Sequence, residues 1–413
     1  MNTSFASAGE FARGWTVIAA CALGVGLGVT GIAFYSMSLF IAPLNQAFGW
    51  TRGDISSASL CLLIGTVLTS PLIGRLIDHW GAMQVALLSM LGVAAGFIGL
   101  SFNTGSLPVY YANWLFISIA GAGTTPVLWT RTVNLWFERR RGLALALTLC
   151  GTGVIALATP VLLNSVIATY GWQSGYRAIA AVILVIGIPC VYLMLRNRIH
   201  AHQAPLAPVS SERSVSALSF SEALSHSNLW KMGLGIFLIA LIVAGQIVHL
   251  VPMMIDTGMA PKDAAATMSI LGIAIIIGRL SIGMLLDYFP APGVAFVVML
   301  LPACACLALL GHANAALVVA LVGGAAGAEV DLLAYLVRRC FSMQHYAQIY
   351  GWLLATFSLG AALGPMVAGH LRDVGGNYDV ALYLGTALTV VGAGLFGSVR
   401  LTAHDHKPVM QTS

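Results

Sequence analysis

Charged residues are scarce in this sequence. Asp, Glu, Lys and Arg make up 8% of its 413 residues, whereas 59% are hydrophobic and the mean hydropathy is +0.90. Soluble domains carry about 25% charged residues, so this chain lacks the polar surface that a soluble globule needs. We therefore predict an integral membrane protein with room for roughly a dozen spans of about 20 residues each.

Motifs for metal, nucleotide and redox chemistry are also lacking. The seven cysteines lie in or at the ends of hydrophobic runs, without a Cys-x-x-Cys pair or a Cys/His cluster, which favours small core residues. The sequence has no Gly-x-x-x-x-Gly-Lys-Ser/Thr motif, which argues against direct drive by ATP. A membrane enzyme or sensor would need a catalytic cluster or an added soluble domain, so we expect no catalytic residues, no cofactor and no metal.

What the sequence does contain is an internal repeat with a spacing of 209 positions. The residues that recur in this register are Pro43 and Pro252, Asp54 and Asp263, Gly74 and Gly283, Leu76 and Leu285, Asp78 and Asp287, Gly142 and Gly351, and Gly151 and Gly360. Chance matches would hardly keep one register, so the chain has two related halves. In membrane proteins such halves usually place a substrate site at their interface and alternate its access.

Twelve apolar runs separate the polar breaks of the chain. They are 15–42, 54–74, 84–102, 108–130, 143–168, 177–195, 230–254, 264–286, 293–311, 314–337, 347–370 and 380–400. We predict an all-α polytopic membrane protein with 12 transmembrane helices in two pseudo-symmetric six-helix bundles. The halves are residues 1–198 and 229–413, joined by a flexible cytoplasmic linker at 199–228 that is rich in Ser, Ala, Pro and His.

The distribution of Lys and Arg predicts the orientation. With a cytoplasmic N-terminus, 14 of these 19 residues lie on the inner side and 4 on the outer side, and Arg279 falls within a span. Both termini are therefore predicted to be cytoplasmic, in the inner or plasma membrane. This asymmetry also accounts for the net charge of +5, which gives no signal for nucleic-acid binding.

Loop motifs resemble a known family. Segment 74–81, which reads Gly-Arg-Leu-Ile-Asp-His-Trp-Gly, resembles the Gly-x-Leu-x-Asp-Arg-x-Gly loop of the major facilitator superfamily, with an echo at 283–287. Segments 48–52 (Phe-Gly-Trp-Thr-Arg), 136–142 (Trp-Phe-Glu-Arg-Arg-Arg-Gly) and 350–351 (Tyr-Gly) are similar to the monocarboxylate porter and oxalate/formate antiporter branch. The resemblance covers essentially the whole chain and implies secondary transport.

In this family the loop carboxylate holds the halves together on the cytoplasmic side. The resemblance implies a latch in which Asp78 pairs with Arg131, and Asp287 pairs with Arg338 or Arg339. The contacts would form and break as the halves move. The alternative is an ordinary surface loop.

Arg279 is the main candidate for substrate binding. It lies eight residues before Asp287, about 12 Å along a helix and so near the bilayer centre. A guanidinium there is costly unless it faces a cavity or a partner. It matches the Arg that binds the substrate carboxylate in the branch, and its planar fork suits a carboxylate. The alternative is a structural pair with Asp331 or Glu329.

The proton carrier has three candidates. The proton-coupled porters of the branch have an Asp four residues before this Arg and a Lys in the first helix, and here those positions are Ile275 and Tyr35. Asp331, Glu329 and His249 lie within spans and could carry a proton instead, because a buried carboxyl or an imidazole can exchange protons near neutral pH. Each could equally be a buried structural residue.

Aromatic and polar side chains could line the substrate cavity. The candidates are Tyr35, Trp129, Gln246, Tyr335, Trp352 and Phe357. Packing within or between helices is the alternative for each of them. If several face inward, an aromatic or branched acid becomes a better substrate than formate or oxalate.

Together these observations favour a secondary transporter of small organic monocarboxylates that takes them up with protons by alternating access. Its predicted partners are a carboxylate substrate, protons and the lipid bilayer, with no nucleic acid, and a monomer is expected to function. The alternative is a drug/proton efflux antiporter of the same fold, which would prefer cationic or neutral lipophilic substrates. A membrane enzyme or sensor fits the sequence less well.

Overall fold

The computed structural model describes residues 3–137, 141–196, 226–341 and 346–400, and all regular elements in these ranges are helices. The first part of the chain forms α1 (Thr3–Gly26), the π-helix η1 (Val29–Ala33), α2 (Phe34–Phe48), α3 (Arg52–Ser56), α4 (Ala58–Trp80), α5 (Ala82–Ser101), α6 (Leu107–Ala120), the 3-10 helix η2 (Ala122–Thr124), α7 (Pro126–Trp136), α8 (Arg141–Tyr170), α9 (Trp172–Val182), the π-helix η3 (Ile183–Gly187) and α10 (Ile188–Leu195). The second part forms α12 (Ser227–Asp256), α13 (Pro261–Met268), α14 (Ile270–Tyr288), α15 (Ala291–Met299), α16 (Leu301–Leu310), α17 (Ala315–Cys340), α18 (Tyr346–Gly375) and α19 (Asp379–Gly397).

Each of the twelve predicted spans coincides with a helix or a broken helix. Within the described ranges, nine helices are long and apolar enough to cross a membrane, or ten if the bent pair Gly14–Gly26 and Val29–Phe48 is one span. The predicted spans at 54–74 and 108–130 fall on α4 and on the pair α6 and α7, where α6 has only 14 residues and η2 separates it from α7. The all-α membrane fold is confirmed.

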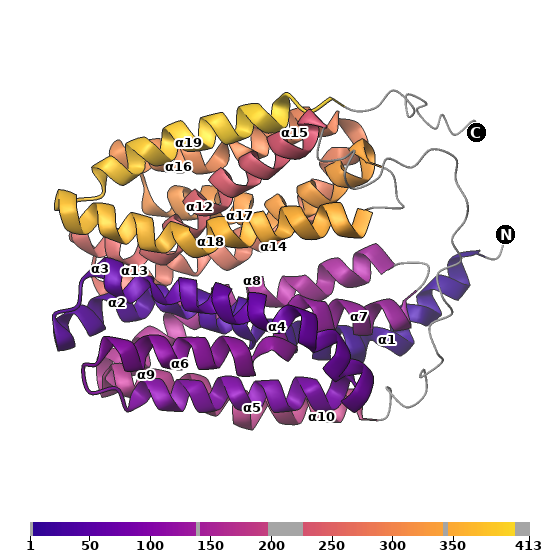
Figure 1. Ribbon diagram of the computed structural model, residues 1–413, viewed down its shortest axis with the longest axis horizontal. Coiled ribbons are helices and arrows are strands. Elements are labelled where there is room, and N and C mark those ends of the chain that lie inside the picture. The colour runs from indigo at the N-terminus through magenta and orange to yellow at the C-terminus, as the bar shows by residue number, and fades with distance from the viewer. Residues whose placement is uncertain (1–2, 138–140, 197–225, 342–345, 401–413) are drawn as a thin grey trace.

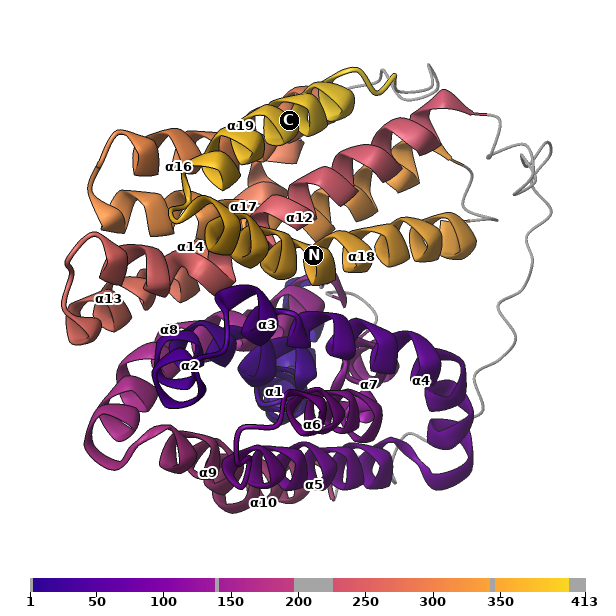
Figure 2. The same ribbon diagram turned by 60° about the vertical axis from the view of Figure 1, so that its left-hand side comes forward.

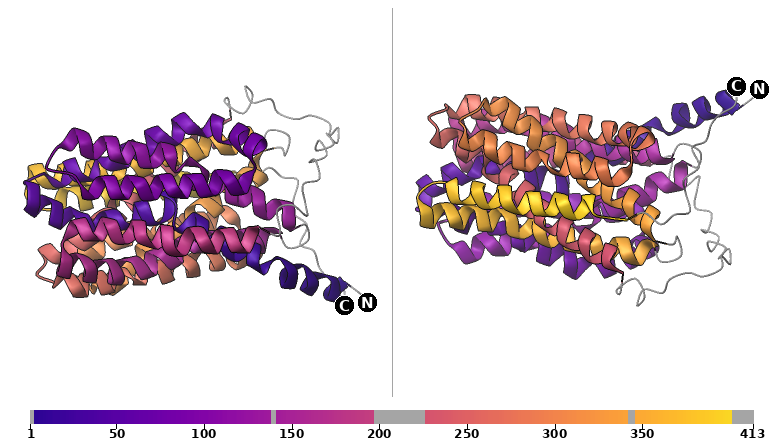
Figure 3. Two further views of the ribbon diagram at one scale, coloured as in Figure 1. Left: turned by 90° about the horizontal axis from the view of Figure 1, so that it is seen from below. Right: turned by 90° about the horizontal axis from the view of Figure 1, so that it is seen from above.

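The helices are arranged in two groups. Figure 1 shows α12–α19 above α1–α10, and Figure 2 shows the same division from another side. α1 begins and α19 ends at one end of the molecule, which we call the terminal face (Figure 3). The other end, where α3 and α13 lie, we call the distal face. The predicted linker at 199–228 lies mostly outside the described residues, and α12 begins at Ser227.

Two repeated glycines make equivalent contacts in the two groups. A Cβ on Gly151 of α8 would lie 2.0 Å from the Ala22 carbonyl oxygen of α1, and one on Gly360 of α18 would lie 2.4 Å from the Phe237 carbonyl oxygen of α12. Side chains would therefore separate both helix pairs. The repeat preserves the residue that lets the helices approach closely.

Local sequence sets the ends and breaks of helices near the site. Thr51 and Asp54 form a reciprocal capping box at the start of α3, with both hydrogen bonds at 3.1 Å. The bend of 41° between α1 and α2 lies around η1, where the Val29 N–H donates to Thr124 Oγ1 at 3.1 Å. This break positions the first residues of α2, including Tyr35.

Candidate functional site

Arg279 lies on α14 and faces α17. Its Nη1 is 3.8 Å from Asp331 Oδ2, and the two side chains are 11% and 32% exposed. Its Nε is buried without a hydrogen-bond partner among the described residues. Asp331 therefore occupies only some of the N–H donors of the guanidinium, and at least one donor remains for another acceptor.

Glu329 lies two residues before Asp331 on the same helix. It is 5% exposed, and its Oε2 has no hydrogen-bond partner in the described part of the chain. Residues two apart on a helix point roughly to opposite sides, yet both carboxyl groups lie within the electrostatic range of Arg279. One guanidinium thus influences two carboxyl groups, of which Asp331 is in contact with it.

Two residues of the first group of helices complete this cluster. Tyr35 of α2 lies within the electrostatic range of both Arg279 and Glu329. Cys150 of α8, which is 8% exposed, lies within that of Arg279 and Asp331. We call Tyr35, Cys150, Arg279, Glu329 and Asp331 the central cluster. It lies where the two groups of helices meet, as expected for a site with alternating access.

Close packing holds α8 against α14 beside the central cluster. A Cβ on Gly272 of α14 would lie 2.2 Å from the Gly153 carbonyl oxygen and 2.3 Å from the Leu157 nitrogen of α8. The two backbones therefore touch one helical turn from Cys150. The sequence predicts Cys150 as a core residue. It belongs to the central cluster because α8 packs against α14.

Some predicted lining residues lie elsewhere in this conformation. Trp129 is fully buried, packs on Gly24 of α1 and donates from Nε1 to the Thr124 carbonyl at 3.1 Å. Trp352 of α18 packs edge to face on Trp230 of α12, with ring centroids 5.5 Å apart. These contacts give both rings a packing role here, and their contact with substrate stays a prediction.

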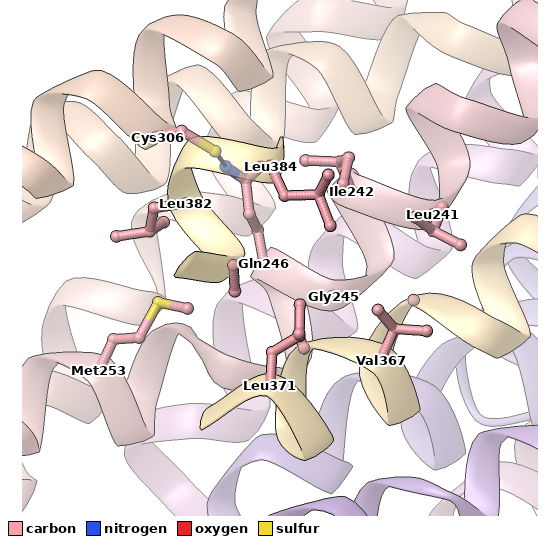
Figure 4. Close-up of a pocket in the computed structure, with 13 residues that line it drawn as sticks. Leu241, Ile242, Gly245, Gln246, Met253, Cys306, Val367, Leu371, Leu382 and Leu384 are labelled. Carbon is pink, nitrogen blue, oxygen red and sulfur yellow. Dashed lines mark hydrogen bonds between the residues drawn. The ribbon is translucent and has the colours of Figure 1, made fainter. Parts of the chain in front are cut away.

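Gln246 lies within the second group of helices. Its Nε2 donates to the Pro302 carbonyl and to Cys306 Sγ, both at 3.1 Å, and its Oε1 is buried without a described partner. It forms part of a small cavity between α12, α16, α18 and α19, together with apolar side chains such as Met253 and Leu382 (Figure 4). This cavity does not include any residue of the central cluster.

Tyr335 and Phe357 remain open as lining residues. Tyr335 is one turn beyond Asp331 on α17, and its hydroxyl accepts from Arg339 Nη2 at 2.9 Å. Phe357 of α18 is partly buried against the core. Their contact with substrate stays a prediction.

The predicted latch lies largely outside the described side chains. The side chains of Asp78 and Asp287 are not described, so their pairing with Arg131, Arg338 and Arg339 stays a prediction. Arg338 is exposed near the end of α17, and Arg339 bonds Tyr335 as above.

Polar contacts join the two groups at the distal face. Arg52 of α3 forms a two-pronged ion pair with Asp256 at the end of α12, with N to O distances of 2.6 and 2.8 Å. The backbone N–H groups of Arg52 and Gly53 donate to Asp373 of α18 at 3.3 and 2.7 Å. In addition, the Ser56 hydroxyl of α3 donates to the Pro365 carbonyl of α18 at 2.9 Å. The distal face is therefore closed in this conformation.

His249 belongs to these distal contacts and not to the central cluster. Its ring is fully buried, with Nδ1 2.8 Å from the Tyr378 hydroxyl and Nε2 2.9 Å from the Pro365 carbonyl oxygen. Tyr378 in turn accepts from Arg52 Nη1 at 3.0 Å. The sequence identified His249 as titratable within a span but gave no sign of these partners.

The chain is similar to known transporters. The family model of the Major Facilitator Superfamily matches residues 22–365. Monocarboxylate transporter 11 of Homo sapiens is 27% identical over 404 residues, which cover 93% of this chain and 82% of that protein. Monocarboxylate transporter 10 of Danio rerio is 25% identical over 387 residues, which cover 89% of this chain and 73% of that protein.

Solved structures show the same fold. The crystal structure of a bacterial homolog of the human lysosomal transporter Spinster, in an inward-facing and occupied conformation, matches with a TM-score of 0.62 and 14% identity, over 93% of this chain and 91% of that chain. At this identity the likeness concerns the fold alone. Since the family model covers most of the chain and the named relatives are transporters, this chain is a membrane transporter and belongs to the Major Facilitator Superfamily.

Proposed function

We propose that this protein transports small organic monocarboxylates by proton-coupled uptake, with Arg279 binding the substrate carboxylate. The observation that carries the proposal is the position of Arg279 between the two groups of helices, with a loose contact of 3.8 Å to Asp331 and an Nε that has no hydrogen-bond partner among the described residues. A guanidinium held this way can exchange Asp331 for a substrate carboxylate. The names of the relatives, monocarboxylate transporters 10 and 11, support the substrate class.

The charge balance of the central cluster supports proton coupling. If Glu329 and Asp331 are both ionised, one cation faces two anions, and a substrate anion would add a third. Like charges about 4 Å apart repel by about 4 kcal/mol at an effective dielectric constant of about 20. Protonation of one carboxyl group removes that repulsion, so substrate and proton would bind together. Asp331, which contacts Arg279 and is the more exposed of the two, is the proposed carrier.

The proposal includes an orientation. The excess of Lys and Arg in the loops on one side supports cytoplasmic termini. With both termini inside, the distal face would be outside and the described conformation would be closed to the outside. The membrane would be the inner or plasma membrane, with halves 1–198 and 229–413 around the linker 199–228, and a single chain would suffice. The Tyr35 ring within the electrostatic range of Arg279 supports acids with an aromatic or branched body.

Two pairs of matched ligands test the substrate class. The thermal shift of the purified protein is measured with benzoate and lactate and with their methyl esters, since ligands that bind the folded state raise its melting temperature. Acids should stabilise the protein and esters should not. Equal stabilisation by acid and ester, or stabilisation only by lipophilic cations, would contradict the carboxylate site and favour the drug/proton antiporter.

A further inference from the structure

The residues that close the distal face form one chain of hydrogen bonds that ends at a histidine. Arg52 donates to the Tyr378 hydroxyl at 3.0 Å, this hydroxyl lies 2.8 Å from His249 Nδ1, and His249 Nε2 lies 2.9 Å from the Pro365 carbonyl oxygen. Ser56 of α3 donates to that same carbonyl at 2.9 Å. The chain therefore begins and ends on α3 and passes through α12, α18 and the start of α19.

The direction of these hydrogen bonds fixes the state of the ring. A guanidinium only donates hydrogen bonds and a carbonyl only accepts them. Tyr378 therefore accepts from Arg52, and His249 Nε2 is protonated and donates its N–H to the Pro365 carbonyl. Tyr378 then has one proton left, which it donates to His249 Nδ1. Burial raises the pKa of Tyr378 to about 12, against the opposing effect of Arg52, so it keeps this proton at neutral pH. The closed arrangement is satisfied only by a neutral His249.

Protonation of Nδ1 would break this pattern. The Tyr378 hydroxyl proton would lose its acceptor, and a second cation would be buried beside Arg52 and near Arg372. The pKa of Arg52 stays raised, because its hydrogen bonds to Asp256 and Tyr378 outweigh the lowering effect of burial, so Arg52 remains charged. Asp256 already pairs with Arg52, and Asp373 accepts two backbone N–H groups of α3.

We propose that His249 and Tyr378 make the distal gate sensitive to pH: the gate closes only around a neutral His249, and acid outside the cell opens it. The gate is Arg52, His249, Asp256, Asp373 and Tyr378. The proposal rests on the proposed orientation for the word outside, but it requires neither a carboxylate substrate nor the central cluster. It gives His249 a role in gating in place of the predicted role of proton carrier.

The sign and size of the effect follow from linkage. The closed form binds no proton at His249, whereas an exposed histidine in the open form would titrate near pH 6.5, roughly. Below that value the ratio of open to closed protein rises about tenfold for each unit by which the pH falls, and above it the ratio hardly changes. The ratio should therefore rise about tenfold from pH 7.5 to 5.5. Free carboxylates titrate at about pH 4, which is below the range from pH 7.5 to 5.5.

Distances between spin labels on the two groups measure this ratio. Gln46 and Val374, which are both exposed at the distal face, are replaced by an amino acid with a ketone side chain that carries the label. This chemistry leaves the seven native cysteines unchanged. The full-length protein in lipid nanodiscs, without substrate, is compared at pH 7.5 and 5.5. From pH 7.5 to 5.5, we expect the population at the longer distance, relative to that at the shorter one, to rise about tenfold in the wild type. In His249→Gln it should rise less than about twofold, because the amide can donate to Pro365 and accept from Tyr378 without titrating.

Two other histidines serve as controls. His370 of α18 is exposed near the gate, and His312 is exposed with a φ of 52°, which Asn tolerates. His370→Gln and His312→Asn should respond as the wild type does. A response that persists in His249→Gln, disappears in His370→Gln or is absent from the wild type would overturn the proposal.

A second variant keeps the test valid if His249→Gln does not fold. Tyr378→Phe removes the hydroxyl that bonds both Arg52 and His249. The open form should therefore gain about fivefold or more already at pH 7.5, since the loss of one hydrogen bond of ordinary strength alone corresponds to about fivefold. An unchanged ratio in this variant would show that the hydrogen-bond chain does not hold the gate. Since no ligand is added, none of these results depends on whether carboxylates bind.

Discussion

Replacement of Arg279 tests the centre of the proposed mechanism. In Arg279→Ala the substrate carboxylate would lose a charge-assisted contact in a site that is largely shielded from water. Such a loss costs roughly 2–5 kcal/mol, which corresponds to about 30-fold to several thousand-fold in affinity. Arg279→Lys should restore little, because an ammonium keeps the charge but not the two-pronged geometry. Binding of benzoate to the purified protein by calorimetry, and uptake into proteoliposomes, measure the two effects.

The stability of the variant must be separated from its affinity. Arg279→Ala leaves Asp331 and the buried Glu329 without their nearby cation, and removing one partner of a buried pair can cost about 3–5 kcal/mol. Asp331 is 32% exposed, so water screens part of this cost. The double variant Arg279→Ala/Asp331→Ala removes both partners and should regain most of the melting temperature without regaining binding.

A matched control is available on the first group of helices. Arg177 of α9 donates to Ser101 at 3.2 Å and packs over the Phe102 ring at 5.3 Å, away from the central cluster. Arg177→Ala should bind and transport as the wild type does. If Arg279→Ala still takes up the acid, or if the double variant regains affinity with its stability, Arg279 is a structural residue and the anion site is refuted.

Two further predictions concern coupling and conformational exchange. If Asp331 carries the proton, Asp331→Asn should abolish uphill uptake driven by a pH gradient but keep exchange of labelled for unlabelled substrate at equal concentration; intact pH-driven uptake would exclude Asp331 as carrier and leave Glu329. If Asp78 acts as a latch, Asp78→Asn should slow transport while equilibrium binding stays within a few fold, because the change affects movement of the halves and not the site. Lost binding with unchanged transport would contradict that role.

Much of the fold could be predicted from the sequence because its signals are local or regular. Twenty apolar residues in a row require a helix across the bilayer, whatever their neighbours are, so each predicted span coincides with a helix or a broken helix. The spacing of 209 positions preserved Gly151 and Gly360, which make the same close helix contact in each group. The loop motifs identified the family that the comparisons confirm.

The sequence also singled out Arg279 and its possible partners, because a charge inside a span is rare and costly. It could not rank those partners. Asp331 and Glu329 lie two residues apart, and only the packing of α14 on α17 decides which of them makes the contact of 3.8 Å. Asp331 makes it, while Glu329 stays buried with one oxygen that has no partner in the described part of the chain. Side-chain direction around a packed helix depends on its neighbours, and sequence spacing does not contain it.

Contacts between distant segments were decided by tertiary structure alone. His249 and Tyr378 are 129 residues apart and Arg52 and Asp256 are 204 apart, yet they form one network at the distal face. Cys150 is a core residue by its sequence, and it comes within the electrostatic range of Arg279 only because Gly153 and Gly272 let α8 and α14 touch. Hydropathy and charge counts set which segments enter the membrane and which way they point, whereas the pairing of their side chains depends on how the two groups of helices pack against each other.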